Sequence, residues 1–390
     1  MKLPIRMTLI AAVALLAAPA HAASVNLRFI GQQILPTGTQ VLGTTLGGLS
    51  GIDYDAASRT YLTISDDRSQ INPARFYTLS LDLTSTRFNA VNFTATQTLK
   101  QAGGSPFPAL GIDPEAIRLN GRGGFYYTSE GDANVFQSPF VREARGDGSF
   151  IRDLALPSYY LPTATAGIRQ NLAFESLALT PNGTIFTATE NALRQDGSAA
   201  TLTNASFARL LAFNPASGSP LAEYVYEVAP INQSPNPLTA FATNGLVEIL
   251  ALSDSRFIGV ERSFSVGAPG TGYSVKLFDI DISGATNVIG LSSLTGANFA
   301  TVRKTLLFDL GTLGIPLDNI EGISFGQTLE NGRQSLILVS DNNFGATQFT
   351  QFLAFELSAI PETSSWAMMI GGFGLVGGAL RRRRGQLATV

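Results

Sequence analysis

The sequence predicts an all-β protein with the architecture of a β-propeller. One observation is a series of short runs with alternating apolar and polar residues, such as 61–64, 125–128 and 184–187, separated by turn sequences such as Pro181-Asn182-Gly183. This pattern is typical of antiparallel strands. The other observation is an internal repeat, whose units begin at positions 50, 115, 175, 248 and 321. Repeated four-stranded units arranged around an axis form a propeller.

Each repeat begins with a short strand-like motif, continues through a turn, and reaches a second strand that ends in an acidic residue. The first motifs are Ser50-Gly51-Ile52, Glu115-Ala116-Ile117, Glu175-Ser176-Leu177, Glu248-Ile249-Leu250 and Glu321-Gly322-Ile323. Two more strand-like runs follow, for example 75–81 and 88–98 in the first unit and 273–280 and 302–310 in the fourth. We therefore expect five visible blades of four antiparallel strands.

The last repeat has a single outer run, at residues 349–357, and the N-terminal run at 27–35 belongs to no repeat. We expect this N-terminal strand to complete the last blade and to close the ring, which hides both sheet edges. Six blades are possible if a long linker contains a weak blade. A pair of β-sandwiches is the alternative architecture.

The N-terminal residues 1–22 have the pattern of a secretory signal peptide. Lys2 and Arg6 precede an apolar run at 7–18, and Ala20-His21-Ala22 forms a small-x-small cleavage site. We expect export and cleavage before Ala23, which leaves a propeller domain at 23–358 and a C-terminal tail at 359–390.

The tail is apolar and Gly-rich from residue 366 to 380, and a cluster of arginines follows. It resembles the PEP-CTERM sorting signal of Gram-negative bacteria, in the variant with Pro-Glu followed by Trp-Ala, although Thr363 replaces the usual second proline. The resemblance implies a short membrane segment, cleavage by an exosortase-type protease, and a final location in the periplasm, on the outer surface or in the extracellular matrix. A plain tail anchor is the alternative. The sorting residues are Pro361, Glu362, Trp366, Arg381, Arg382, Arg383 and Arg384.

Composition excludes several kinds of chemistry. The chain has no cysteine, and its single histidine, His21, lies in the signal peptide. A Ser-His-Asp triad, a cysteine nucleophile and imidazole or thiolate zinc sites are therefore excluded from the body. Gly322-Ile323-Ser324-Phe325-Gly326 fits the nucleophile-elbow motif, but we interpret it as part of a repeated strand.

The body is acidic. Of 26 basic and 29 acidic residues in the chain, 20 and 28 remain after both ends are removed, a net charge near −8. This argues against nucleic acid as a partner, and we expect membrane contact through the tail alone. We expect a monomer.

The repeat places acidic residues at the start of first strands and at the end of second strands, which lie at the same end of an antiparallel pair. If the first strands line the channel, nine carboxylates converge on one mouth. Such oxygens repel one another, and Ca²⁺ would relieve this repulsion. The alternative is that they cap turns or pair with Arg68, Arg118, Arg194 and Arg262. The candidate metal ligands are Asp66, Glu115, Glu130, Glu175, Glu190, Glu248, Glu261, Glu321 and Asp341.

Several motifs of the body resemble secreted propeller proteins with phytase-like esterase activity. They are Gly48-Leu49-Ser50-Gly51-Ile52-Asp53, Asp113-Pro114-Glu115-Ala116-Ile117, Phe174-Glu175-Ser176-Leu177-Ala178, Ile320-Glu321-Gly322-Ile323 and Asp341-Asn342-Asn343-Phe344. The resemblance implies Ca²⁺-dependent hydrolysis of phosphate esters.

Combined with the acidic mouth, this resemblance predicts a hydrolase that acts on a small phosphorylated or ester substrate. The candidate catalytic residues are Glu175, Glu321, Arg118 and Arg262. Two alternatives stay open, a non-enzymatic surface or matrix propeller that binds a ligand or cation, and a Ca²⁺-dependent carboxyl-esterase or lactonase.

Overall fold

The computed structural model describes residues 24–360, and the predicted signal peptide and sorting tail lie outside them. One compact unit runs from Leu27 to Leu357. Its strands, in chain order, are β1 (Ser24–Pro36), β2 (Gln40–Val41), β3 (Thr44–Thr45), β4 (Leu49–Asp55), β5 (Thr60–Ser65), β6 (Arg75–Leu83), β7 (Phe88–Thr98), β8 (Pro114–Leu119), β9 (Gly124–Ser129), β10 (Phe140–Arg145), β11 (Phe150–Asp153), β12 (Phe174–Leu179), β13 (Ile185–Thr189), β14 (Ser206–Phe213), β15 (Pro220–Val228), β16 (Ala242–Ala251), β17 (Arg256–Ser265), β18 (Tyr273–Asp281), β19 (Arg303–Asp309), β20 (Asn319–Thr328), β21 (Gln334–Asp341) and β22 (Phe349–Ile360).

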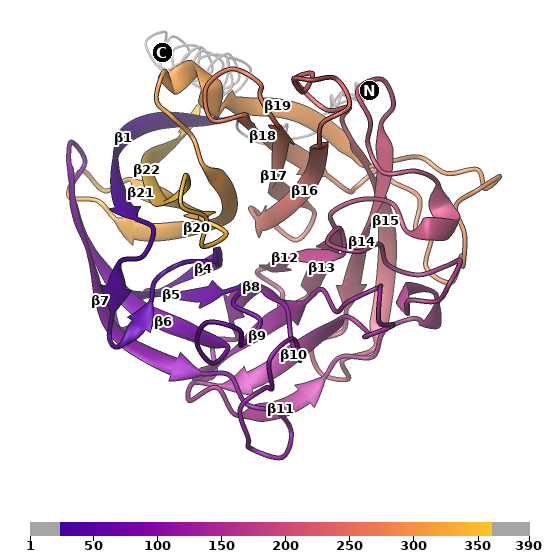
Figure 1. Ribbon diagram of the computed structural model, residues 1–390, viewed down its shortest axis with the longest axis horizontal. Helices are drawn as coiled ribbons and strands as arrows, with labels where there is room; N and C mark the ends of the chain where they lie inside the picture. The colour runs from indigo at the N-terminus through magenta and orange to yellow at the C-terminus, as the bar shows by residue number, and fades with distance from the viewer. Residues whose placement is uncertain (1–23, 361–390) are drawn as a thin grey trace, which may run out of the picture. The chain divides into compact units, whose positions relative to one another are not determined.

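These strands form a five-bladed β-propeller, which confirms the predicted fold class (Figure 1). Blade one is β4–β7, blade two β8–β11, blade three β12–β15 and blade four β16–β19, each an antiparallel four-stranded sheet. In blade five the order is β20, β21, β22, β1, so the N-terminal strand completes the last blade as expected. β2 and β3 form a separate two-stranded ladder.

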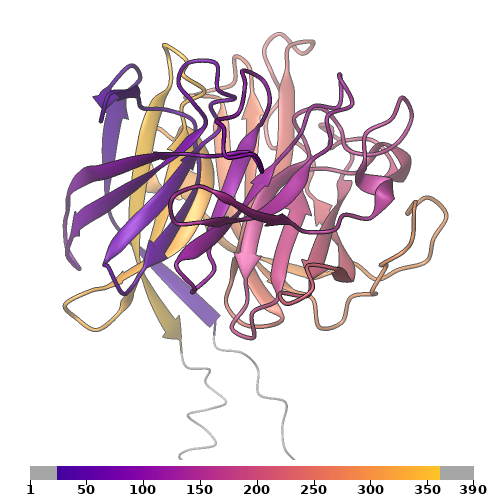
Figure 2. The ribbon, with the colours of Figure 1, turned by 90° about the horizontal axis from the view of Figure 1, so that it is seen from below.

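The first strand of each blade lies nearest the axis, and each of these inner strands contacts the next around the ring (Figure 1). Seen from the side, many strands run between the two faces of the sheets' ring, with loops at both ends (Figure 2). Three 3-10 turns, η1 (Ser158–Tyr160), η2 (Arg194–Asp196) and η3 (Leu310–Leu313), are the helical elements of residues 24–360. None of them could span a lipid bilayer.

The hydrophobic core lies between neighbouring blades. Phe76 of blade one meets Phe125 of blade two with ring centroids 4.8 Å apart, and Phe186 of blade three meets Phe257 of blade four at 4.9 Å. Each such side chain contributes about 1.5–3 kcal/mol when fully buried. Because the inner strands are buried on both faces, they carry nearly continuous runs of buried residues.

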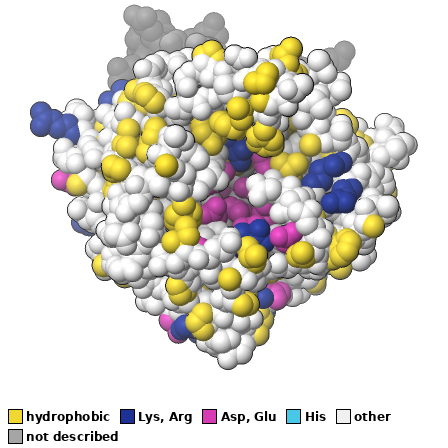
Figure 3. All heavy atoms as spheres, in the orientation of Figure 1, with side chains coloured by type: hydrophobic (Ala, Val, Ile, Leu, Met, Phe, Trp, Pro, Cys, Tyr) yellow, Lys and Arg dark blue, Asp and Glu magenta, His cyan; other side chains and the backbone are white. Residues whose placement is uncertain are grey.

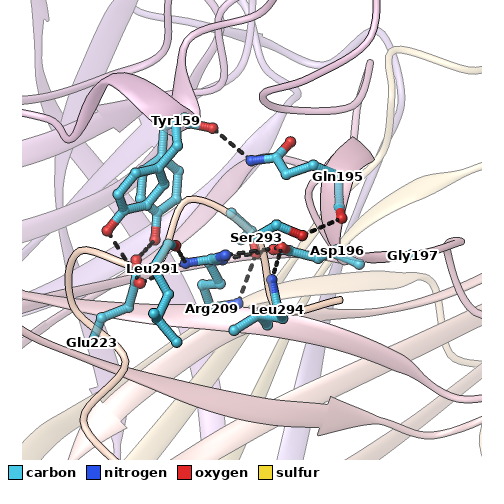
Figure 4. Close-up of polar contacts among 12 residues, drawn as sticks. Tyr159, Gln195, Asp196, Gly197, Arg209, Glu223, Leu291, Ser293 and Leu294 are labelled. Atoms are coloured by element: carbon cyan, nitrogen blue, oxygen red, sulfur yellow. Dashed lines mark hydrogen bonds and ion pairs between the residues drawn. The ribbon is translucent and has the colours of Figure 1, made fainter. Parts of the chain in front are cut away.

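A buried ion-pair network fixes the long connection between β18 and β19 against blade three (Figure 4). Arg209 on β14 donates two hydrogen bonds to Asp196, at 2.6 and 2.8 Å, and one to Glu223 at 2.7 Å. It also donates to the carbonyl of Leu291, while Asp196 accepts the amide of Leu294. The connection is therefore held by charge-assisted hydrogen bonds that are buried from solvent.

Candidate metal centre at the propeller mouth

Every blade has a β-bulge at the same position on its inner strand. The register shifts between Leu49 and Gly51 in blade one, and at the matching places in the other four. A bulge inserts an extra residue and redirects its side chain. In blades two, three and five this residue is an acid, and the residue that follows the facing strand, or ends it, is also acidic. The bulge positions are Ser50, Glu115, Glu175, Val247 and Glu321.

The acids at the bulge positions and the acids at the ends of the facing strands form one cluster together with Asp113. We call this cluster the mouth acids. Acidic side chains gather in a hollow near the centre of the face drawn in Figure 3. Glu115, Glu175 and Glu321 offer oxygens that all lie within 4.8 Å of one another, and so do Asp113, Glu115 and Glu130. The mouth acids are Asp66, Asp113, Glu115, Glu130, Glu175, Glu190, Glu321 and Asp341.

The electrostatics of the mouth acids disfavour their charged forms. Burial, and then the charge of Asp113, raises the pKa of Glu130 to about 8. Burial and the neighbouring acids also hold the pKa of Glu115 and of Glu175 well above the usual range. Like charges in a desolvated site have this effect, and a bound cation would reverse it.

Several oxygens at the mouth lack the partners that buried groups normally have. Asp66 Oδ1, Glu190 Oε1 and Asn319 Oδ1 are buried without a hydrogen-bond partner among residues 24–360. Two glycines make room for them, since a Cβ on Gly48 would lie 1.8 Å from Asp66 Oδ1 and one on Gly245 would lie 2.0 Å from Glu190 Oε1. An all-oxygen, partly unsatisfied donor set is the set that Ca²⁺ prefers, so the residues present fit this ion.

One basic residue of the mouth is Arg262, at the trailing position of blade four. Its Nη2 lies 3.0 Å from Glu321 and 3.6 Å from Glu190, and its Nε has no hydrogen-bond partner among the described residues. Tyr273 and Asn319 line the same cavity, of about 500 Å³. Arg262 thus joins two mouth acids, and its Nε is a buried donor without a partner among the described residues.

Arg118 and Glu248 lie deeper in the channel than the mouth acids, where they pair at 2.9 Å. The guanidinium donates to the carbonyls of four inner strands, at Ile52, Ile117, Ile249 and Ile323. Glu248 accepts the amide of Leu177 from the fifth, at 2.8 Å. This pair therefore connects all five blades. Its position in the channel differs from the expectation that Glu248 lies at the mouth and that Arg118 is catalytic.

Glu261 also lies away from the mouth acids. It accepts hydrogen bonds from Tyr226 and Lys304, on blades three and four. The reason is the register of blade four, where Leu246 pairs with Glu261 and the bulge residue is Val247. Successive side chains of a strand point to opposite faces. The one-residue offset in blade four therefore points Glu248 and Glu261 away from the mouth acids and places Arg262 among them.

Of the nine acids predicted as ligands, the structure therefore brings seven together: Asp66, Glu115, Glu130, Glu175, Glu190, Glu321 and Asp341. Sequence reasoning missed Asp113, Asn319 and Tyr273. Asp113 lies in the Asp113-Pro114-Glu115 motif, two residues before a predicted ligand, and that spacing was the available signal. Arg68 holds Asp113 from the side, with Nε 3.5 Å from its carboxylate.

The fold and the site together define a five-bladed propeller with an acidic, oxygen-lined mouth. A family model described as phytase-like, esterase-like activity of phytase, matches residues 44–344. Because this match spans most of the chain, the protein belongs to the phytase-like family. No curated protein matches the sequence.

Solved structures with some similarity include an endo-arabinase, an exo-arabinanase and a beta-xylosidase/alpha-arabinofuranosidase. The endo-arabinase from Bacteroides thetaiotaomicron is 12% identical with a TM-score of 0.43, covering 84% of this chain and 98% of that one. An exo-1,5-alpha-L-arabinanase from a bovine ruminal metagenomic library is 10% identical with a TM-score of 0.41, covering 82% and 95%. A beta-xylosidase/alpha-arabinofuranosidase from a compost metagenome is 10% identical with a TM-score of 0.37, covering 85% and 97%. These scores are too low to support an inference about fold or activity.

Proposed function

We propose that this protein is an exported, Ca²⁺-dependent phosphoesterase whose reaction takes place at the propeller mouth. The observation that carries the proposal is the buried cluster of mouth acids, with unsatisfied oxygens, beside the guanidinium of Arg262, which lines the adjoining cavity. Membership of the phytase-like family supports ester hydrolysis. The body has no histidine and no cysteine, which leaves a carboxylate and metal mechanism as the consistent choice.

In this mechanism five of the mouth acids would hold the metal. Glu115, Glu175 and Glu321 would form the central ligand set, and Asp113 with Glu130 would extend it toward blade two. Bound Ca²⁺ would polarise the phosphate and acidify a water molecule.

Side chains of the protein bind the phosphate and accept the proton. The guanidinium of Arg262, which lines the cavity, donates a hydrogen bond to a phosphate oxygen and orients the ester, while its Nη2 stays engaged by Glu321. Glu190 Oε1, which has no hydrogen-bond partner within the described range, would accept a proton from the attacking water as the new P–O bond forms and the ester P–O bond breaks, and the alcohol would leave with that proton. Arg118 takes no part in these steps, because its guanidinium is occupied by main-chain carbonyls.

Metal removal tests this function. The purified exported protein, dialysed against EDTA, should lose hydrolysis of p-nitrophenyl phosphate by at least tenfold, and millimolar CaCl₂ should restore it. Activity that is unchanged in EDTA would overturn the metal-dependent proposal. Hydrolysis of carboxyl esters but not of phosphate esters would favour the carboxyl-esterase or lactonase alternative, and Ca²⁺ binding without turnover would favour a non-enzymatic surface protein.

We also propose that the chain reaches the cell surface or the periplasm through its two ends. Residues 1–22 direct export, and residues 361–390 are recognised by an exosortase-type protease at the inner membrane. The support is the sequence pattern of these segments, which lie outside the described residues. Sequencing of the exported protein should find Ala23 at its N-terminus, and deletion of residues 361–390 should release a folded body from the cell.

A further inference from the structure

The cavity of about 500 Å³ beside Arg262, which we call the side hollow, has two different walls. One is charged and contains Glu190, Arg262 and Glu321. The other is aromatic and contains Phe241, Phe264 and Tyr273, from blade four. Phe241 is 65% exposed, so its ring is accessible to a ligand in the side hollow.

The aromatic wall is built by strand register. Phe264 and Tyr273 are directly paired across β17 and β18, and their ring centroids lie 4.6 Å apart. Phe241 extends this surface from the residue before β16, with its ring 6.3 Å from that of Phe264. Arg262 and Phe264 are two residues apart on β17, so their side chains leave the same face of the strand. One blade therefore presents a cation and an apolar surface to the same ligand.

The charges of the side hollow limit how many phosphates a ligand can carry. Among the described residues that line it, Arg262 is the one with a positive charge, and Glu190 and Glu321 lie beside it. A single phosphate can accept from the guanidinium of Arg262, whereas further phosphates would face the carboxylates or the aromatic wall. A polyphosphorylated ring is therefore a poor match for this surface.

Building on the proposed function, we propose that the side hollow selects phosphate monoesters of aromatic alcohols, with the phosphate at Arg262 and the ring of the alcohol against Phe241 and Phe264. Ring contacts of this kind contribute through apolar burial and offset stacking. Tyr273 strengthens the wall because its hydroxyl already accepts a hydrogen bond from Gln348 at 3.0 Å, which keeps the ring in place. The proposal assigns Phe241 and Phe264 as specificity-determining residues.

The test compares three substrates in the Ca²⁺-loaded exported protein: phenyl phosphate, glycerol phosphate and inositol hexakisphosphate. We expect kcat/KM to be highest for phenyl phosphate. In Phe241→Ala the ratio of kcat/KM for phenyl phosphate to that for glycerol phosphate should fall about five- to tenfold, mainly through KM. Leu238→Ala is the matched control, since Leu238 is 74% exposed and does not line the side hollow. Its ratio should equal that of the unmodified protein.

Two results would overturn the inference, a preference for inositol hexakisphosphate or an unchanged ratio in Phe241→Ala. If no phosphate ester is hydrolysed, the proposed function fails, and calorimetric titration with phenylphosphonate still decides the inference. Binding that weakens in Phe241→Ala but not in Leu238→Ala would support the aromatic subsite without catalysis. Equal binding by both variants, or no binding, would overturn it.

Discussion

Glu175 is the residue whose role is most directly testable. It is buried, contributes an oxygen to the proposed central ligand set, and has a pKa held well above the usual range by burial and by Glu130 and Glu115. Glu175→Gln keeps the shape of the side chain and removes a charge that repels its neighbours. We therefore expect the melting temperature in EDTA to stay the same or rise, while the affinity for Ca²⁺ falls at least tenfold.

The control for this variant is Glu227→Gln, on an exposed position of β15. It should leave both the melting temperature and the calorimetric Ca²⁺ affinity unchanged. A large drop in the melting temperature of Glu175→Gln in EDTA would show that Glu175 serves folding, and its assignment as a ligand would then be wrong.

The mouth acids also predict how the metal-free protein responds to pH. Burial raises the pKa of Asp113 to about 7, and burial and Asp113 raise the pKa of Glu130 to about 8. In the unfolded chain such carboxyls titrate near ~4. The folded state thus retains protons that the unfolded state releases, so this stabilisation is complete below about pH 4 and is lost as the pH rises to about 8.

Melting in EDTA should therefore occur at a higher temperature at pH 5.5 than at pH 8. With millimolar CaCl₂ the increase in melting temperature over EDTA should be larger at pH 8, because the ion binds the deprotonated acids. The pH dependence in EDTA should be shallower in Glu130→Gln. A melting temperature in EDTA that rises with pH would contradict the prediction.

At the scale of single strands, the sequence predicts the pairing of the elements better than their register. The five repeats, the four strands of each and the closing strand follow from alternation and turn residues. Blade four shows the limit: Glu248 and Glu261 match the acidic pattern of the other blades, yet the bulge places Val247 and Arg262 at the mouth. A bulge shifts by one residue which side chains point to a given face of the strand. A strand that is buried on both faces has no apolar–polar alternation from which the position of the bulge could be predicted.

The connection between β18 and β19 provides the prediction at this scale. Arg209 and its partners Asp196 and Glu223 are fully buried in side chain, so removal of the arginine leaves two carboxylates unpaired. Arg209→Met should lower the free energy of unfolding by roughly 3–5 kcal/mol. Chemical denaturation measures this, with Arg87→Met as an exposed control that should change it little. A loss equal to that of the control would mean that the network does not hold the connection.

For the molecule as a whole, the ion pair of Arg118 and Glu248 has the widest reach, because it contacts all five inner strands. Arg118→Met removes the donor of four carbonyls and leaves Glu248 unpaired, so we expect a loss of roughly 3–5 kcal/mol in the free energy of unfolding. The double variant Arg118→Met with Glu248→Gln should lose less than the sum of the two single variants. Additive losses would show that the two side chains act independently.

The closure of blade five has a consequence for the order of events during synthesis. β1 is among the first segments made, but its partner β22 is among the last. Residues 37–348 between them take on the order of 15–60 s to synthesise at about 5–20 residues per second. Until then β1 has an unpaired edge, which is able to join any exposed strand. At high concentration, β1 is therefore the segment through which two newly made chains would exchange strands, each completing the ring of the other.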